Sequence, residues 1–213
     1  MDPQTRYKKE RQTSKQNRTR HILETAETVF TVKGIEKTTM QDIANAANIG
    51  IATLFRYFPR KEKLIVAAAT KRLEPMLSRF EEIAELEATC FEKLDRLFEA
   101  FIHDNNALDI KLMVDFENYA SHSSEPLEDI QAYNALHRQI SAQYSRIIQQ
   151  GMEDGSIRSD LQVRETLTTI MNTFGLFSKS LVIQSNILLL ESDLEFEKQL
   201  RVLKDILLGY VKA

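Results

Sequence analysis

The chain has 213 residues, of which 43% are hydrophobic, so it can bury a core and is not expected to be disordered. Its single cysteine, Cys90, excludes a disulfide framework and a cysteine-rich zinc module. The longest apolar run, Leu64–Ala69, is far shorter than the roughly 20 residues of a membrane-spanning helix, and the polar, basic N-terminus has no signal-peptide core. We therefore expect a cytoplasmic protein.

The net charge of −3 hides an uneven distribution along the chain. Residues 1–61 contain 12 Lys and Arg against 6 Asp and Glu, whereas residues 62–213 contain 16 against 25. A basic N-terminal part on an acidic remainder favours a polyanion-binding module joined to a part that does not bind the polyanion. The chain has only 6 glycines and 4 prolines, and no Asn-Gly or Asp-Gly hairpin lies between alternating apolar runs. This pattern predicts an all-α fold.

The first predicted elements are a polar segment and two helices. Residues 1–17 are expected to form a flexible basic arm. Apolar residues then recur at helical spacing and predict a helix over about Lys15–Lys33, which Gly34 can end with a positive φ. Thr39-Met-Gln-Asp predicts a capping box at the start of a second helix, which ends at about Ala47.

Three residues, Asn48-Ile49-Gly50, separate this second helix from a third over Ile51–Phe58, which Pro59 ends. This spacing is typical of a helix-turn-helix. The turn needs one residue with positive φ, and Asn48 is the best choice other than glycine. The outward-facing residues at the start of the third helix are small, as entry into a major groove about 12 Å wide requires.

Residues 18–65 resemble the DNA-binding segment of TetR-family transcriptional regulators. The resemblance is carried by residues 38–64, TTMQDIANAANIGIATLFRYFPRKEKL. The sequence departs from the family pattern at four positions. The family usually has Gly, Ser, Tyr and Ser where this chain has, respectively, Asn48, Gly50, Phe55 and Arg60. Loss of the tyrosine hydroxyl at Phe55 puts one phosphate contact in doubt.

The resemblance implies six DNA contacts. Phosphate contacts are expected from Thr39, Tyr57 and Lys61, and base-edge or groove contacts from Ala52, Thr53 and Arg56. Free amides at a helix N-terminus favour a phosphate beside Thr39, and an arginine such as Arg56 can read a guanine with two hydrogen bonds. The alternative is that all six are solvated polar or small residues on an ordinary helix pair.

The acidic remainder predicts about six further helices, giving about nine in total. The first of them runs from Lys61 towards Ile83, and Pro75 is expected to kink or break it. We expect an N-terminal three-helix DNA-binding domain with a helix-turn-helix over residues 18–60. A larger C-terminal helical bundle over residues 61–213 is expected to bind a ligand and to dimerise.

Two C-terminal helices carry rows of apolar residues at the spacing typical of packed helix bundles. Apolar residues are spaced 4, 3, 4, 3, 4 over Val163–Leu181 and 4, 3, 4, 3 over Phe196–Tyr210. The resemblance implies a dimer built from these two helices, and the expected interface residues are Ile170, Phe174, Phe177, Leu181, Leu200, Leu203, Leu207 and Tyr210. A second row contains small residues and allows close helix approach: Met171, Gly175, Ser178 and Val182. The alternative is that both rows are core.

The resemblance also implies a ligand cavity inside the C-terminal bundle. The candidate lining residues are Phe98, Phe101, Met113, Phe116, Tyr119, His137, Tyr144 and Phe174. For each of them a core position is at least as well supported, because apolar stripes fill cores by default. No catalytic, phosphate-binding or metal motif occurs, and the four histidines lack ligand spacing, so we expect no enzyme activity, cofactor or metal. Cys90 is expected to be an inert packed thiol, with a redox sensor as the alternative.

These features predict a ligand-responsive transcriptional regulator, in the first instance a repressor. Its homodimer would bind a palindromic DNA operator, and a small-molecule effector in the C-terminal bundle would release it. The alternative is a non-regulatory DNA-binding protein that recruits a partner protein through its C-terminal domain. An enzyme would need a convergent set of titratable groups that the sequence does not display.

Overall fold

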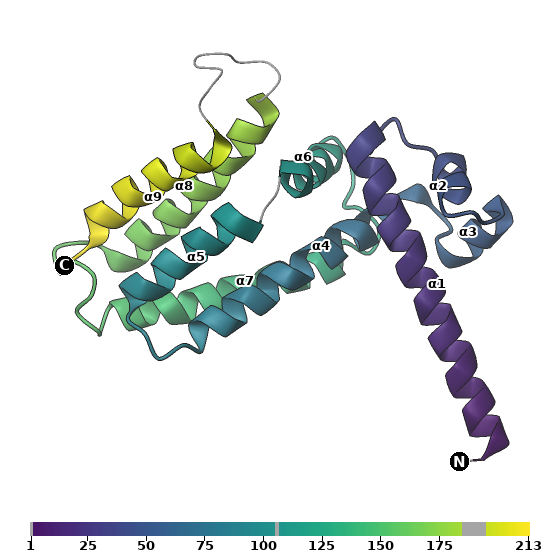
Figure 1. Ribbon diagram of the computed structural model, residues 1–213, viewed down its shortest axis with the longest axis horizontal. Coiled ribbons are helices and arrows are strands. Elements are labelled where there is room, and N and C mark those ends of the chain that lie inside the picture. The colour runs from purple at the N-terminus through teal and green to yellow at the C-terminus, as the bar shows by residue number, and fades with distance from the viewer. Residues whose placement is uncertain (1, 105–106, 185–194) are drawn as a thin grey trace. The chain divides into compact units, whose positions relative to one another are not determined.

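A computed structural model describes residues 2–104, 107–184 and 195–213. Within these ranges the chain forms nine α-helices and no strand beyond a single antiparallel bridge between Ile157 and Lys212 (Figure 1). The helices are α1 (Pro3–Lys33), α2 (Met40–Ala46), α3 (Ile51–Tyr57), α4 (Lys61–Ala84), α5 (Cys90–Asp104), α6 (Ala107–Ser121), α7 (Ile130–Gly151), α8 (Val163–Gln184) and α9 (Phe196–Val211). The expected all-α fold is confirmed. None of the described helices is apolar over a stretch long enough to span a bilayer.

The chain divides into two compact units. Unit 1 contains residues 1–71 and 112–133, and unit 2 contains residues 72–111 and 134–213. The expected division between residues 60 and 61 differs from this one. Leu64 and Ile65, in the first turns of α4, are almost completely buried and belong to unit 1, as does most of α6.

Helix α1 begins much earlier than expected. It starts at Pro3 rather than near Lys15, so the expectation of a loose arm over residues 1–17 is corrected: nearly all of this segment is helical. Proline is favoured in the first turn of a helix, and no glycine or further proline interrupts the chain before Gly34. The side chains of residues 4–18 are all exposed, so no packing within the chain supports this half of the helix.

The second half of α1 forms one wall of the unit 1 core. Ile22, Ala26 and Phe30 lie on one face and are completely buried. Helix α1 packs on α2, and α2 on α3, where Ala44 and Leu54 are also completely buried. The helix ends as predicted, because Gly34 has a φ of 85° and its N–H donates to the Phe30 carbonyl at 2.8 Å.

Helix α4 continues through Pro75 without a break. Of the two expected effects of this proline, a kink or a break, the break is therefore wrong. Pro75 lies on an exposed face, where water can solvate the carbonyl that lacks its helical donor. The proline therefore removes one hydrogen bond without ending the element.

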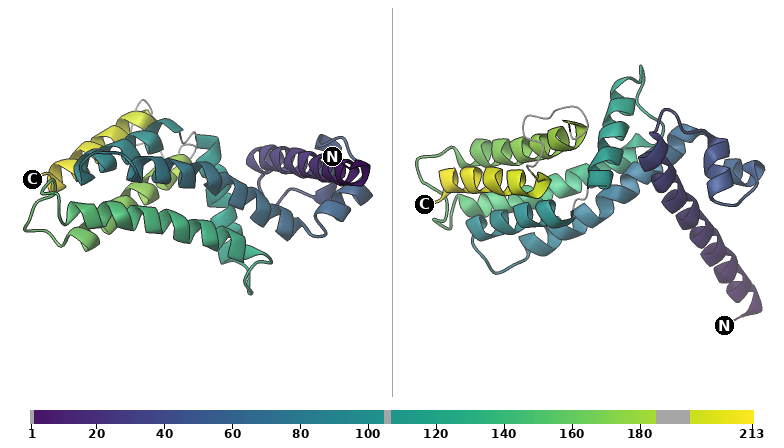
Figure 2. Two further views of the ribbon diagram at one scale, coloured as in Figure 1. Left: turned by 90° about the horizontal axis from the view of Figure 1, so that it is seen from below. Right: turned by 45° about the horizontal axis from the view of Figure 1, so that its top comes forward.

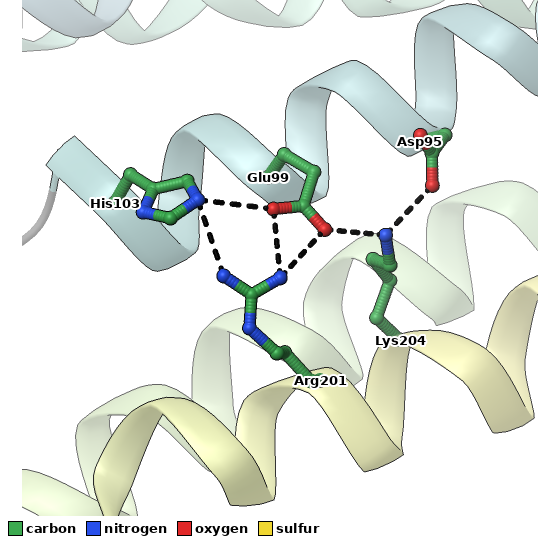
Figure 3. A network of polar contacts seen from close by, with 5 residues as sticks. All are labelled: Asp95, Glu99, His103, Arg201 and Lys204. Carbon is green, nitrogen blue, oxygen red and sulfur yellow. Dashed lines mark hydrogen bonds and ion pairs between the residues drawn. The ribbon is translucent and has the colours of Figure 1, made fainter.

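In unit 2, helix α9 packs against both α5 and α8 (Figure 1, Figure 2). A polar network joins α5 to α9 (Figure 3). Lys204 Nζ lies 2.8 Å from Asp95 Oδ1 and 2.5 Å from Glu99 Oε1, and Arg201 lies 3.0 Å from Glu99 Oε2. His103 Nε2 lies 3.2 Å from the same Glu99 carboxylate. The hydrogen bond from Lys204 is the largest cause of a lowered pKa at Glu99, so the carboxylate stays ionised and holds one face of α9 against α5.

Candidate nucleic-acid interface

The turn between α2 and α3 has the backbone that the sequence predicts. Asn48 has a φ of 51°, which confirms the positive φ expected there. Its N–H donates to the Asn45 carbonyl at 3.1 Å, and the N–H of Ile49 donates to the Ala44 carbonyl at 3.0 Å. Gly50 then occupies the N-cap of α3. These local bonds fix the direction in which α3 leaves the turn.

The N-terminus of α2 carries the predicted capping box. The Asp42 N–H donates to Thr39 Oγ1 at 3.1 Å, and the Thr39 N–H donates to Asp42 Oδ2 at 2.7 Å. Lys33 Nζ lies 2.5 Å from the same Asp42 oxygen. The hydrogen bond from Lys33, followed by those from Thr39, holds the pKa of Asp42 far below its usual value. Thr39 is exposed, so the capping box and a passing phosphate can share this helix end.

Replacing Thr39 with alanine is expected to destabilise the chain by about 1 kcal/mol, because the first turn of α2 loses its cap.

Asp42→Asn is expected to lower stability at neutral pH. Because the folded-state pKa of Asp42 is depressed, its stabilising effect is present above the unfolded value of about 4 and is lost as the pH falls. Urea unfolding of the wild type and Asp42→Asn should therefore show a difference at pH 6 that narrows at pH 3.5. A difference that grows on acidification would contradict this role.

The outward face of α3 is accessible. Ala52 and Arg56 are exposed, and Thr53 and Tyr57 are half-buried. The Arg56 guanidinium carbon lies 5.7 Å from the centre of the Tyr57 ring, so this arginine can be held over the ring by a cation–π contact. Phe55, where a hydroxyl contact was in doubt, is 45% exposed. All four predicted α3 residues thus retain surface that a ligand can reach, and their contact with DNA stays a prediction.

Lys61, at the start of α4, is tied to the loop before α2. Its Nζ donates to the Glu36 carbonyl at 3.0 Å, and partial burial lowers its pKa. All six residues predicted to contact DNA therefore belong to unit 1, between the α2 cap and the start of α4. The structure brings them into one compact unit without assigning the contacts.

Sequence reasoning missed an acidic anchor at the start of α4. Glu128 and Asp129 lie just before α7, and Lys63 Nζ is 3.0 Å from the first and 3.2 Å from the second. Arg60, expected to add a cation beside α4, lies 3.6 Å from Glu128. The Glu128 N–H donates to the Glu62 carboxylate at 2.5 Å. No local pattern reveals contacts across more than sixty residues of chain.

Four of the residues predicted to line a ligand cavity meet in unit 2. The Phe98 and Phe174 ring centres are 4.5 Å apart, and Phe101 lies 6.2 Å from Phe174. Phe80, which the prediction omitted, bridges Phe101 at 6.3 Å and Tyr144 at 6.2 Å. The Tyr144 hydroxyl donates to the Leu167 carbonyl at 2.6 Å. These residues form an aromatic cluster of core character, and their role as a cavity lining stays a prediction.

The other four candidates are not in this cluster. Met113, Phe116 and Tyr119 belong to unit 1, where the Phe116 ring lies 4.8 Å from that of Tyr133. His137 is exposed on α7, because it lies outside the buried positions of that helix. This exposure does not support its predicted place in a cavity lining.

The helices α8 and α9 bury different residues from those expected at a dimer interface. Ile170, Phe174 and Leu200 are at most 4% exposed within the single chain, which corrects their assignment, since such side chains have no surface left for a partner. The other predicted residues keep some or much of their surface: Phe177, Leu181, Leu203, Leu207 and Tyr210. Four large apolar residues that the prediction omitted are about half or more exposed: Leu176, Ile183, Val202 and Ile206.

The described residues contain no group of three or more side chains placed to hold a metal ion. Cys90 is completely buried, and burial raises the pKa of its thiol to about 12. The thiol is thus protonated at neutral pH, which favours the inert role over a redox sensor.

Comparison with known proteins agrees with this geometry. The profile of bacterial regulatory proteins of the tetR family matches residues 22–68, which include the helix-turn-helix. The HTH-type transcriptional repressor KstR2 of Mycolicibacterium smegmatis is 27% identical over 142 residues, covering 67% of this chain and 68% of the relative.

Solved structures share the fold. The ketosteroid transcriptional regulator KstR2 of Mycobacterium tuberculosis aligns with a TM-score of 0.62 and 23% identity, over 92% of this chain and 95% of that one. FadR from Bacillus subtilis, solved in complex with stearoyl-CoA, aligns with a TM-score of 0.65 and 20% identity, over 89% of this chain and 97% of that one. The matched helix-turn-helix, together with relatives that are transcriptional repressors, supports a transcriptional regulator of the TetR family.

Proposed function

We propose that the chain is a ligand-responsive repressor that binds a palindromic DNA operator as a homodimer and leaves it when a small-molecule effector binds in the C-terminal part. The observation that carries this proposal is the outward face of α3. It begins with the exposed Ala52 and presents Arg56 one turn later, after a turn fixed by Asn48. A narrow helix start with an arginine behind it suits a major groove.

The exposed apolar residues of α8 and α9 support a dimer. Val202, Ile206 and Tyr210 follow one face of α9 at steps of four residues, and each is more than half exposed. Leu176 and Ile183 lie two helical turns apart on α8 and are also exposed. Arg201 and Lys204 hold another face of α9 against α5, so the apolar face stays outward. Pairing these helices with those of a second copy would give a dimer with two helix-turn-helix motifs, which could bind half-sites one duplex turn apart.

The aromatic cluster of unit 2 supports a small-molecule effector, because similar folds can hold a ligand. The FadR structure from Bacillus subtilis is a complex with stearoyl-CoA. Opening the contacts of Phe101 with Phe80 and Phe174 would provide an apolar site. Effector binding would favour a conformer with low DNA affinity, and such coupling typically changes affinity by about 5–150-fold.

Selection of duplexes from a random library with the full-length protein tests the DNA-binding part of this proposal. The expected product is a palindrome with half-sites about 10 base pairs apart. Small molecules would then be titrated into the protein–operator complex, and at least one class should lower operator affinity within the range given above. Operator binding that no small molecule changes, together with partner capture that depends on the α8 and α9 face, would instead favour the non-regulatory DNA-binding protein.

Arg56→Ala and Lys61→Ala should separate base reading from phosphate binding. Loss of the Arg56 guanidinium is expected to cost about 1–3 kcal/mol on the selected operator and to relax preference at one base position. Loss of the Lys61 ammonium is expected to weaken every duplex alike and to reduce the salt slope by about 1. Fluorescence anisotropy over a salt series measures both quantities, with Lys111→Ala, an exposed α6 cation, as the charge-matched control. Equal losses on all sequences for Arg56→Ala and Lys61→Ala would refute the assignment.

A further inference from the structure

The exposed half of α1 carries a row of four cations. Lys8, Arg11, Lys15 and Arg18 follow one another at steps of three, four and three residues, which places them on one face of the helix. All four are exposed. Their side chains form no hydrogen bond or ion pair with any residue that the structure describes. We call these four residues the basic row.

Among the described residues, no acid neutralises the basic row. Between residues 3 and 20 the sequence contains a single acidic residue, Glu10, and its carboxylate lies 2.9 Å from Arg6 on another side of the helix. Cations three and four residues apart on a helix repel one another and disfavour the helix. No apolar packing offsets that repulsion, because the side chains of residues 4–18 are exposed. No described contact of the basic row therefore stabilises the fold.

The basic row continues the face of α1 that packs on the helix-turn-helix. A step of four residues from Arg18 reaches Ile22, and Ala26 and Phe30 extend the same face into the core of unit 1. Because α1 is one uninterrupted helix, the row points to the side on which α2 lies. The N-terminal half of α1 extends beyond α2 and α3 (Figure 1, Figure 2). The row is thus carried past the reading helix on the same side of the unit.

The dimensions of the basic row suit a phosphate strand. From Lys8 to Arg18 the helix rises about 15 Å. One strand of a duplex carries a phosphate about every 3.4 Å along its axis, so this length runs beside about four phosphates. The DNA duplex that α3 is proposed to bind is a polyanion. Its negative charge complements the positive charge of the basic row.

We propose that the basic row is a second DNA-contacting surface, which binds backbone phosphates of the duplex flanking each half-site. This inference rests on the proposed function, because α3 has to hold a duplex before α1 can reach its flank. Lysine and arginine on phosphates position a protein without reading bases. The row therefore adds affinity and salt dependence and leaves sequence preference unchanged.

Two matched triple variants of the full chain test this surface. The row variant carries Arg11→Gln, Lys15→Gln and Arg18→Gln, and the control carries Arg6→Gln, Lys9→Gln and Arg20→Gln. Each removes two arginines and one lysine from exposed positions of α1, so the change in net charge is the same. Glutamine is nearly as good a helix former as lysine and arginine, and circular dichroism checks that both variants keep their helix content.

The probe is the duplex that the wild type selects from a random library, with one further duplex turn on each side. The row variant is expected to lose about 0.9 from the salt slope for each lost phosphate contact, hence about 2.7 per chain. The deficit in its duplex affinity relative to the wild type should accordingly shrink about 40-fold for each bound chain between 50 and 200 mM salt. The control should stay close to the wild type, and the base preferences of the row variant should be unchanged.

Three results would overturn the inference. Equal salt slopes for the row and control variants on a selected duplex would reject the basic row and leave the proposed function standing. A slope difference that persists on a duplex trimmed to its two half-sites would place the contacts elsewhere than on the flanks. If the wild type selects no duplex at all, the proposed function fails and the inference falls with it.

Discussion

Leu176→Glu and Ile206→Glu are expected to convert the operator-binding dimer into a monomer. Leu176 on α8 and Ile206 on α9 are 67% and 62% exposed in the single chain, so a charge at either position is solvated in the monomer. In a dimer through this face the same carboxylate would be buried without a partner. Because one helix-turn-helix motif cannot gain from the second, affinity for a two-half-site duplex should fall about 10²–10⁴-fold.

Size-exclusion chromatography with light scattering measures the mass, and anisotropy measures binding to duplexes with one or two half-sites. Met152→Glu is the matched control, since Met152 is also a large hydrophobic side chain, is 56% exposed and lies after α7. It should leave mass and affinity unchanged. If both glutamate variants keep the dimer mass, the exposed face of α8 and α9 is not the interface.

Gly151→Ala is expected to destabilise unit 2 by about 1–3 kcal/mol, the usual cost of overpacking a well-packed interior. A Cβ at this position would lie 2.6 Å from Cys90 Sγ, 3.1 Å from Cys90 Cβ and 3.3 Å from a side-chain carbon of Ile157. The start of α5 cannot easily withdraw, because the Cys90 N–H donates to Asp154 at 2.6 Å and the Phe91 N–H donates to Ser156 at 3.1 Å. The melting temperature should fall by several degrees.

Adding Cys90→Ala to Gly151→Ala should recover part of the loss, because it removes the sulfur atom responsible for the shortest contact. Urea unfolding of the two single variants and the double variant gives the coupling free energy, expected at about 0.5–3 kcal/mol. Gly209→Ala serves as the control, since nothing in the chain lies within 4 Å of its added Cβ and alanine favours a helix. Strict additivity of the two substitutions would mean that the sulfur is not the obstacle.

The helix-turn-helix could be predicted residue by residue because its determinants are local. The capping box joins Thr39 to Asp42, three residues away, and the positive φ of Asn48 follows from the length of the turn. Each of these interactions acts within one or two turns of chain, where spacing alone specifies geometry. The family resemblance of the same residues added the assignment of DNA contacts.

The first half of α1 was misjudged for a different reason. Its polar composition suggested a loose arm, whereas Pro3 in the first turn and the absence of a later breaker allow one helix as far as Lys33. Composition predicts whether a segment packs, and residues 4–18 indeed remain exposed. It does not by itself predict whether their backbone is helical.

The faces of α8 and α9 could not be predicted because they depend on neighbours distant in sequence. Periodicity located both helices, but which face of α9 turns inward depends on its contacts with α5, among them the salt bridges of Arg201 and Lys204. Glu128 and Lys63 likewise meet across more than sixty residues. The sequence around Lys63 does not indicate that Glu128 lies beside it, and the sequence around Glu128 does not indicate Lys63.

Pro75 has a consequence for the stiffness of α4. The amide that proline lacks would have bonded to the carbonyl four residues earlier, at Lys71, and Lys71 is the last residue of unit 1 in this helix. A helix resists bending through its unbroken ladder of hydrogen bonds, so α4 is most compliant where its residues pass from one unit to the next. Helix α4, which has residues in both units, thus lacks a backbone hydrogen bond at the residue where unit 1 ends.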